Sequence, residues 1–324
     1  MAHAAKIEGL SRNFDKSLRM LDAQPTPLQY LSHPLLAEKE VELAVLRLDK
    51  VHQEVSGNKY FKLKYNLAEA KKLGEKTILT FGGAFSNHIY ATASAAHTAG
   101  FHSIGIIRGE DADRGNSTLA HAQKKGMQLH FTDRESYRMK DSAGFQEKLR
   151  AQFGDFYLIP EGGTNEMAIR GTKEILKEAH ANFSHVCLSI GTGGTFAGLA
   201  ASLRNHQYLI GFSSLKGLFI FKEIEELLTK YGIQSPGKLE IRTDYHFGGY
   251  GKTKQELIDF MRWFYSEFGI PLDPIYTGKM AIGVWDLVGK DHFPKGSTIL
   301  LIHTGGLQGN AGFFKQTGID LPTL

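Results

Sequence analysis

Three short segments rich in small residues contain the side chains of this sequence that could do chemistry. They read SGNK at Ser56–Lys59, GGAFSNH at Gly82–His88 and SIGTGGT at Ser189–Thr195. Together they offer an amine, hydroxyls, an amide and an imidazole beside glycines that let the backbone approach a ligand closely. Such groups allow nucleophilic chemistry at the amine and binding of an anion by backbone N–H groups.

The third segment has the features of an anion-binding turn. It follows an apolar, strand-like run and opens a helix of small residues, where consecutive N–H groups suit a phosphate. The segment does not match the dinucleotide-binding pattern GxGxxG, because Phe occupies position 196. It does not match a P-loop either, because the glycines are not followed by the required lysine. Taken alone, it is equally compatible with a tight turn that binds nothing.

Ser86 and Lys59 each have a structural explanation beside the chemical one. Ser86 stands at the start of an alanine-rich helical stretch, where serine is a favoured N-cap. Lys59 begins an amphipathic stretch, and most such lysines are surface charges, since a catalytic lysine has no local signature beyond partial burial. The residues alone leave both alternatives open.

The elements that must position these residues alternate along the chain. Apolar, β-branched runs predict strands over 77–81, 103–107, 156–159, 186–190, 208–212 and 297–303. Helical periodicity predicts helices over 59–73, 86–99, 142–153, 166–179, 219–231 and 254–268. This alternation indicates an α/β fold with mostly parallel sheets, in which ligands gather at the carboxyl ends of the strands.

Composition excludes several classes of protein. The 324 residues favour two domains, and 42% hydrophobic and 22% charged residues are typical of a soluble protein. The net charge of +4 comes from scattered basic residues without a nucleic-acid-binding motif, so no nucleic-acid partner is expected. The 14 histidines form neither HxH nor HExxH, so no metal is expected. The single cysteine, Cys187, excludes an intramolecular disulfide.

Localisation follows from the same survey. No apolar run reaches the length of a membrane span, and the first residues lack the apolar centre of a signal peptide. One cysteine fits a reducing compartment. We therefore expect a cytoplasmic protein that does not enter a membrane.

In this order, the three segments resemble the fold-type II pyridoxal-phosphate enzymes, specifically the family of 1-aminocyclopropane-1-carboxylate deaminase and D-cysteine desulfhydrase. Further fragments extend the likeness over nearly the whole chain: Pro25–Leu28, Glu161–Asn165, Gly248–Lys252, Asp273–Lys279 and His303–Gly306. The resemblance implies two three-layer α/β/α domains of the tryptophan synthase β-like type. The large, discontinuous domain would comprise residues 1–62 and 164–324, and the small domain residues 63–163. It also implies a homodimer.

The resemblance implies roles for individual residues as well. Lys59 would carry pyridoxal 5′-phosphate and then act as acid or base. Asn87 would contact the phenolic oxygen of the cofactor. The phosphate would be held by the loop of Gly191, Thr192, Gly193, Gly194 and Thr195. Either Thr277 or Thr304 would contact the pyridine nitrogen.

Four residues are expected to face the substrate: Ser86, Asn87, His88 and Tyr276. Ser86 and Tyr276 would be catalytic, since the deaminases use a serine and a tyrosine at these positions. His88 either shuttles protons or is a hydrogen-bonded structural histidine. Tyr60-Phe61 follow the lysine where many members have a basic residue, which leaves the details of the pocket open.

The two threonines determine which substrate the resemblance favours. Thr277 stands where cyclopropane-cleaving members typically have Glu, and Thr304 where they typically have Leu. A threonine cannot hold the charge of a protonated pyridine as a glutamate can, so the electron sink is weaker. A weaker sink is sufficient for β-elimination of a good leaving group. A lyase that converts D-cysteine or another β-substituted alanine into a 2-oxo acid and ammonia is therefore expected.

Three alternatives stand beside this interpretation. A deaminase would open the cyclopropane amino acid to 2-oxobutanoate and ammonia. A pyridoxal-phosphate-binding protein would show little turnover. A dinucleotide-dependent oxidoreductase is disfavoured by the missing GxGxxG pattern.

Overall fold

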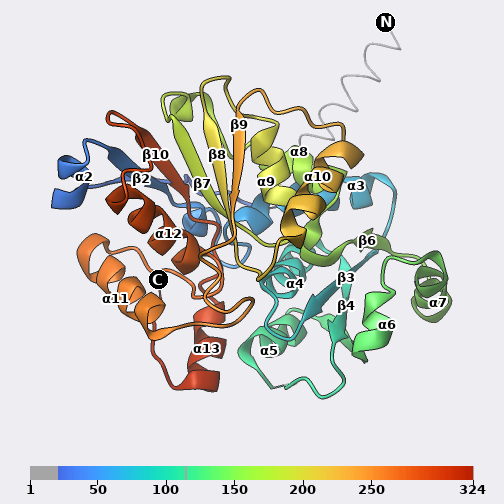
Figure 1. Ribbon diagram of the computed structural model, residues 1–324. Helices are drawn as coiled ribbons and strands as arrows, with labels where there is room; N and C mark the ends of the chain where they lie inside the picture. Colours follow the sequence, from blue (N-terminus) through green and yellow to red (C-terminus); the bar gives the residue numbers. More distant parts are fainter. Residues whose placement is uncertain (1–20, 114, 324) are drawn as a thin grey trace, which may run out of the picture.

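Two β-sheets form the centre of the molecule (Figure 1). The computed structural model describes residues 21–113 and 115–323. The larger sheet has the order β1 (Leu28–Leu31), β2 (Glu42–Leu46), β10 (Thr298–Ile302), β7 (His185–Ile190), β8 (Tyr208–Ser213), β9 (Lys238–Arg242). The smaller sheet has the order β5 (Met127–Thr132), β4 (His102–Arg108), β3 (Thr77–Gly83), β6 (Tyr157–Ile159).

All neighbouring strands are parallel except β1 and β2. Parallel strands need crossover connections, and helices supply them. The helices are α2 (Pro34–Glu38), α3 (Asn58–Lys72), α4 (Asn87–Ala99), α5 (Ser117–Lys124), α6 (Arg134–Arg138), α7 (Ala143–Phe153), α8 (Glu166–Thr172), α9 (Gly194–Ala200), α10 (Phe219–Lys230), α11 (Gln255–Phe268), α12 (Thr277–Gly289) and α13 (Gly309–Thr317). The predicted α/β class with mostly parallel sheets is confirmed.

Both faces of the larger sheet are buried, because alternate side chains of a strand point to opposite faces. In β10, Leu300 and Ile302 join a core with α3, α9 and α10, whereas Ile299 and Leu301 join a second core with α11 and α12. The first core also takes in Ile78 of β3 and alanines of α4. One apolar core therefore connects the two sheets.

The smaller sheet is also covered on both faces. One face packs against α6 and α7, and the other against α4 and α5. All four of its strands lie within the predicted small domain, 63–163. Residue 62, however, lies inside α3, whose buried side chains belong to the shared core. The limits of the two domains stay a prediction.

All six strands predicted from the sequence are present, within one or two residues at each end. The prediction of one helix over 166–179 is wrong. α8 ends at Thr172, and the chain then turns through hydrogen bonds from the Glu174 and Ile175 amides to the carbonyls of Gly171 and Thr172. This turn buries Ile175 in the core and directs Glu174 toward Lys64 and Tyr65. Tertiary packing has overridden helical periodicity here.

No helix among residues 21–113 and 115–323 is long and apolar enough to cross a membrane.

A buried ionic network joins the ends of the neighbouring strands β2 and β10. Arg47 follows β2 and donates hydrogen bonds to both carboxylate oxygens of Asp49, among them Nε to Oδ1 at 2.9 Å and Nη2 to Oδ2 at 2.6 Å. His303 follows β10, and its Nδ1 lies 3.4 Å from the same carboxylate. All three side chains are at most 2% exposed. Although burial acts to raise the pKa of Asp49, His303 and Arg47 hold it below its usual value.

We expect Asp49→Asn to lower the free energy of unfolding at pH 7 by about 3 kcal/mol, because it leaves the Arg47 guanidinium buried without its partner. A carboxyl with a lowered folded pKa stabilises above its unfolded pKa, about 4, and loses this contribution as pH falls through the folded pKa. The difference between wild type and variant should therefore shrink as urea denaturation is repeated from pH 7 toward pH 3.

Glu69→Gln is the control, because Glu69 forms an exposed pair with Lys72 and should change stability by less than about 0.5 kcal/mol. An Asp49→Asn variant as stable as wild type at pH 7 would contradict the prediction.

Candidate active site

A cavity of about 810 Å³ lies at the carboxyl ends of strands from both sheets. Its wall includes the segments after β3, β6, β7 and β10. The volume is typical of a site for a small molecule, and parallel α/β sheets bind ligands at this end. The three segments that drew attention in the sequence all contribute to this one wall.

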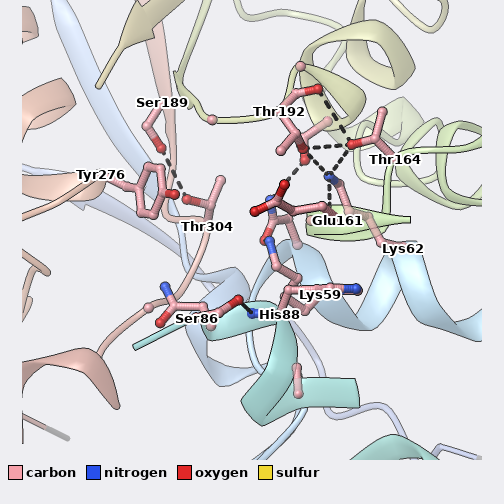
Figure 2. A pocket seen from close by; sticks show the side chains of 18 of the residues that line it. Lys59, Lys62, Ser86, His88, Glu161, Thr164, Ser189, Thr192, Tyr276 and Thr304 are labelled. Carbon is pink, nitrogen blue, oxygen red and sulfur yellow. Dashed lines mark hydrogen bonds between the residues drawn. The ribbon is translucent and has the colours of Figure 1, made fainter. Parts of the chain in front are cut away.

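Lys59 extends from the first turn of α3 into the cavity (Figure 2). Among the described residues its ammonium has one hydrogen bond, to Asn58 Oδ1 at 3.4 Å, and no carboxylate within ion-pair distance. Burial lowers the pKa of Lys59 to about 8, although the negative charge of Asp273 acts to raise it. At pH 7 about a tenth of Lys59 is therefore a neutral, nucleophilic amine, far more than for an exposed lysine.

The backbone before Lys59 is fixed by the loop after β10. Gly57 has φ +67°, and a Cβ at this residue would lie 1.9 Å from the Thr304 carbonyl oxygen. The Asn58 amide donates to that same oxygen at 3.2 Å. Only glycine fits this approach, so Gly57 sets the position from which Lys59 enters the cavity.

The glycine loop after β7 lies beside a second buried lysine. Lys62 is one helical turn after Lys59, and its Nζ contacts Gly162 O at 2.9 Å, Thr164 Oγ1 at 3.2 Å and Thr192 Oγ1 at 3.4 Å. Burial and the charge of Lys59 hold the pKa of Lys62 well below its usual value. Among the described residues, this cation has no carboxylate partner. A phosphate in the loop would supply the missing negative charge.

The sequence interpretation did not assign a role to Lys62. The available signal was its spacing of three residues from Lys59, which places both side chains on one helix face. In the predicted loop itself, Gly191, Thr192, Gly193 and Thr195 line the cavity, whereas Gly194 packs against Thr164 and the Lys62 ammonium. Thr195 Oγ1 accepts a hydrogen bond from Asn58 Nδ2 at 2.8 Å, which connects the loop to α3.

Ser86 is the N-cap of α4 and also lines the cavity. Its Oγ accepts hydrogen bonds from the amides of His88 at 3.2 Å and Ile89 at 3.3 Å. The capping interpretation is thus confirmed, but it does not exclude chemistry. Because Ser86 Oγ is only an acceptor in these bonds, its proton stays available to a ligand.

His88 is buried and has partners for both ring nitrogens. Nε2 lies 2.8 Å from Thr80 Oγ1, and Nδ1 lies 3.4 Å from Thr92 Oγ1. Thr80 donates its own proton to the Ile159 carbonyl, so His88 Nε2 is the donor to Thr80. Burial, with Lys59 and Lys62, holds the pKa of His88 well below its usual value. This geometry favours the structural alternative over a proton shuttle.

The two threonines differ in position. Thr277 Oγ1 donates to Asp273 Oδ1 at 2.6 Å and accepts from the Asp273 amide at 2.8 Å, and Thr277 does not line the cavity. Thr304 does line it, together with Ser189, whose Oγ is 3.3 Å from Thr304 Oγ1. Of the two candidates, Thr304 alone presents a hydroxyl to a ligand.

Tyr276 and Asn87 complete the wall around Lys59. Burial raises the pKa of Tyr276 well above its usual value, so the phenol keeps its proton. Its ring lies 6.2 Å from that of Tyr250, a cavity residue to which the sequence interpretation gave no role. The side-chain Oδ1 of Asn87 accepts a hydrogen bond from Gln308 Nε2 at 2.7 Å. The side-chain Nδ2 of Asn87 stays available to a ligand.

Comparisons with known proteins identify the chemistry of such a site. The family model described as pyridoxal-phosphate dependent enzyme matches residues 20–305. A relative from Pyrococcus horikoshii, provisionally named a 1-aminocyclopropane-1-carboxylate deaminase, is 32% identical over 297 residues, 88% of this chain and 90% of the relative. D-cysteine desulfhydrase of Klebsiella pneumoniae is 29% identical over 305 residues, which are 87% of this chain and 92% of the relative. A crystal structure described as an ACC deaminase homologue has a TM-score of 0.76 at 26% identity. The match covers 94% of this chain and 97% of that chain.

We expect Lys62→Met to raise the Kd for pyridoxal phosphate by about tenfold or more, because a charge-assisted hydrogen bond to the phosphate is lost. Binding of pyridoxal, which has no phosphate, should change little. Absorbance titration of the apoprotein measures both constants. Lys64→Met is the control, since Lys64 pairs with Glu174 outside the cavity. Equal weakening of both ligands would contradict a phosphate contact.

Proposed function

Because this chain belongs to the family of pyridoxal-phosphate-dependent enzymes, we propose that it eliminates the β-substituent of a small amino acid, as D-cysteine desulfhydrase does. The products would be a 2-oxo acid, ammonia and the leaving group. The observation that carries this proposal is the wall at the carboxyl ends of β7 and β10. It presents the hydroxyls of Ser189 and Thr304 to the cavity and no carboxylate.

The residues present fit the cofactor from one end to the other. Figure 2 shows Lys59 between the Lys62, Thr164 and Thr192 group and the Ser189, Tyr276 and Thr304 group. We assign the phosphate to the loop of residues 191–195 with Lys62, the carbonyl carbon to Lys59, and the phenolic oxygen to Asn87. The pyridine nitrogen is assigned to Thr304. When bound, pyridoxal phosphate stabilises the negative charge that develops at the α-carbon of the substrate.

The protein groups around Lys59 then have separate tasks. The neutral amine of Lys59 accepts the α-proton, for which a pKa of about 8 is well matched to neutral pH. The backbone N–H of Asn87 lies at the start of α4 and has no partner among the described residues. It donates to the substrate carboxylate, and the helix dipole adds to this attraction. Ser86 donates its available hydroxyl proton beside it. Tyr276, still protonated, is positioned to donate to the leaving group.

The hydroxyl at the pyridine end limits the reaction. Thr304 cannot carry the charge that would hold a proton on the pyridine nitrogen, so carbanion stabilisation is modest. Loss of a thiolate from the neighbouring carbon needs less of it than opening an unactivated ring. This reasoning favours D-cysteine and other β-substituted alanines.

Ring opening of 1-aminocyclopropane-1-carboxylate to 2-oxobutanoate is the second candidate. It is favoured by the provisional names of relatives that are 32% identical over 88% or more of this chain. We also propose, from the resemblance to this family, a homodimer in the cytoplasm.

The experiment that tests the function is the visible spectrum of the purified protein before and after each amino acid is added. We expect an absorbance band of the bound cofactor in wild type that Lys59→Ala abolishes. D-cysteine should shift the band and release sulfide and pyruvate. Release of 2-oxobutanoate from the cyclopropane amino acid, with D-cysteine unchanged, would favour the second candidate. A band that no amino acid alters would indicate binding without turnover.

Ser86→Ala should remove both a cap and a catalytic hydroxyl. The lost cap costs about 1 kcal/mol of stability, and we expect kcat to fall by about 100-fold because the hydrogen bond that orients the substrate beside Lys59 is lost. Ser142→Ala is the matched control, since Ser142 caps α7 outside the cavity through the Phe145 amide. It should lose similar stability, measured by thermal unfolding, and keep wild-type kcat. Equal kcat values in the two variants would show that Ser86 is only a cap.

A further inference from the structure

The cavity wall contains charged side chains that the proposed reaction does not use. Arg108 is the last residue of β4, Lys140 and Asp141 follow α6, and Glu161 follows β6. All four come from the region of the smaller sheet, opposite the larger-sheet wall that contains Thr304.

Three of these charges already have partners. Lys140 Nζ lies 3.4 Å from Glu161 Oε2 and 3.5 Å from Asp141 Oδ2. The Arg108 side chain is exposed and makes no hydrogen bond or ion pair with another residue in 21–113 or 115–323. Its guanidinium carbon lies 5.7 Å from the centre of the Tyr137 ring, a cation–π contact that uses none of its N–H groups as hydrogen-bond donors to an oxygen.

Arg108 is held close to the substrate residues by the sheet. It pairs with Gly83, the last residue of β3, three residues before Ser86. Its Nη2 lies 3.6 Å from the point that a Cβ on Gly83 would occupy. The guanidinium therefore lies over the turn that leads to Ser86, and Gly83, Phe85 and Ser86 line the cavity with it.

The α-carboxylate of the substrate does not need Arg108. The α4 N-terminus supplies the unpaired Asn87 amide N–H and the Ser86 hydroxyl for that group. A guanidinium with free donors at a second point of the wall is suited to a second anion, because carboxylate, sulfonate and phosphate oxygens match its planar arrangement of donors.

We propose that Arg108 binds an anionic group on the side chain of the substrate, so that the enzyme prefers amino acids with a negatively charged β-substituent. The inference rests on the proposed function, because it assumes an amino-acid substrate bound beside Lys59. An anionic side chain would gain charge-assisted hydrogen bonds from Arg108 that an uncharged side chain cannot form, which is the basis of discrimination.

O-phosphoserine illustrates the reaction for such a substrate. The Cα–H bond breaks, its electron pair forms the Cα–Cβ double bond, and the Cβ–O bond breaks with its pair leaving on phosphate. Water then hydrolyses the C–N bond. The sum is O-phosphoserine and water giving pyruvate, ammonia and phosphate, with no oxidant or reductant.

Binding without turnover separates Arg108 from the chemistry. 2-Amino-3-phosphonopropionate and alanine both lack a group that can be eliminated, and they differ by one phosphonate. Spectral titration of the holoenzyme with the D and L forms gives Kd for each. We expect wild type to bind the phosphonate more tightly, and Arg108→Ala to raise its Kd by about tenfold or more. The Kd of alanine should change by less than about twofold.

Arg138→Ala is the control, because Arg138 is an exposed cation at the end of α6 that does not line the cavity. It should leave both constants unchanged. Equal weakening of phosphonate and alanine by Arg108→Ala would overturn the inference, since it would place Arg108 on the α-carboxylate that both share. Wild type that binds alanine at least as tightly as the phosphonate would overturn it as well.

Turnover distinguishes this inference from the proposed function. With β-chloroalanine, D-cysteine and O-phosphoserine as substrates, Arg108→Ala should lower kcat/KM for O-phosphoserine alone, mainly through KM. If no amino acid gives a 2-oxo acid with wild type, the proposed function fails, whereas the two Kd values still decide the role of Arg108.

Discussion

The site depends on one close approach, between the loop that precedes α3 and the loop that follows β10. Gly57 lies against the Thr304 carbonyl, and Asp49 holds Arg47 on one loop near His303 on the other. β2 and β10 are neighbours in the larger sheet, so both loops leave the same edge. Lys59 and Thr304 are therefore fixed relative to each other by buried ionic and backbone contacts. A buried ionic network is poor evidence for stability but can specify one arrangement.

From this arrangement the ends of the cofactor site follow. α3 begins beside Thr304 and continues past the loop after β7, so Lys59 and Lys62 face one cavity from successive turns. The shared apolar core packs α3 against the larger sheet and also takes in β3 and α4. This packing brings Ser86 and Asn87, which belong to the smaller sheet, to the same lysine. Groups that follow strands of the two sheets meet at Lys59 because α3 packs in the one core that both sheets share.

Local patterns in the sequence predicted much of the fold, because buried parallel strands are short apolar runs bounded by turns. The strands over 77–83 and 185–190 and the turns after them were found in this way. Local patterns could not distinguish Thr277 from Thr304, since the difference is a hydrogen bond to Asp273 that only the folded chain forms. The positions of Lys62 and Arg108 at the cavity could not be predicted for the same reason. A lysine in a helix and an arginine at the end of a strand have no local signature, and only the folded chain places them at a cavity.

The charges of the wall divide the site into regions with different tasks. Lys62 and the glycine loop provide for one anion, the α4 N-terminus for a second, and Arg108 has donors for a third. The end of the cavity that we assign to the pyridine ring, by contrast, presents the hydroxyls of Ser189 and Thr304. A site that binds anions strongly but stabilises a carbanion weakly gains most from a substrate whose leaving group departs readily as an anion. The proposed role of Arg108 at the smaller sheet and the uncharged hydroxyls at the larger sheet thus favour the same reaction, β-elimination, over the opening of an uncharged ring.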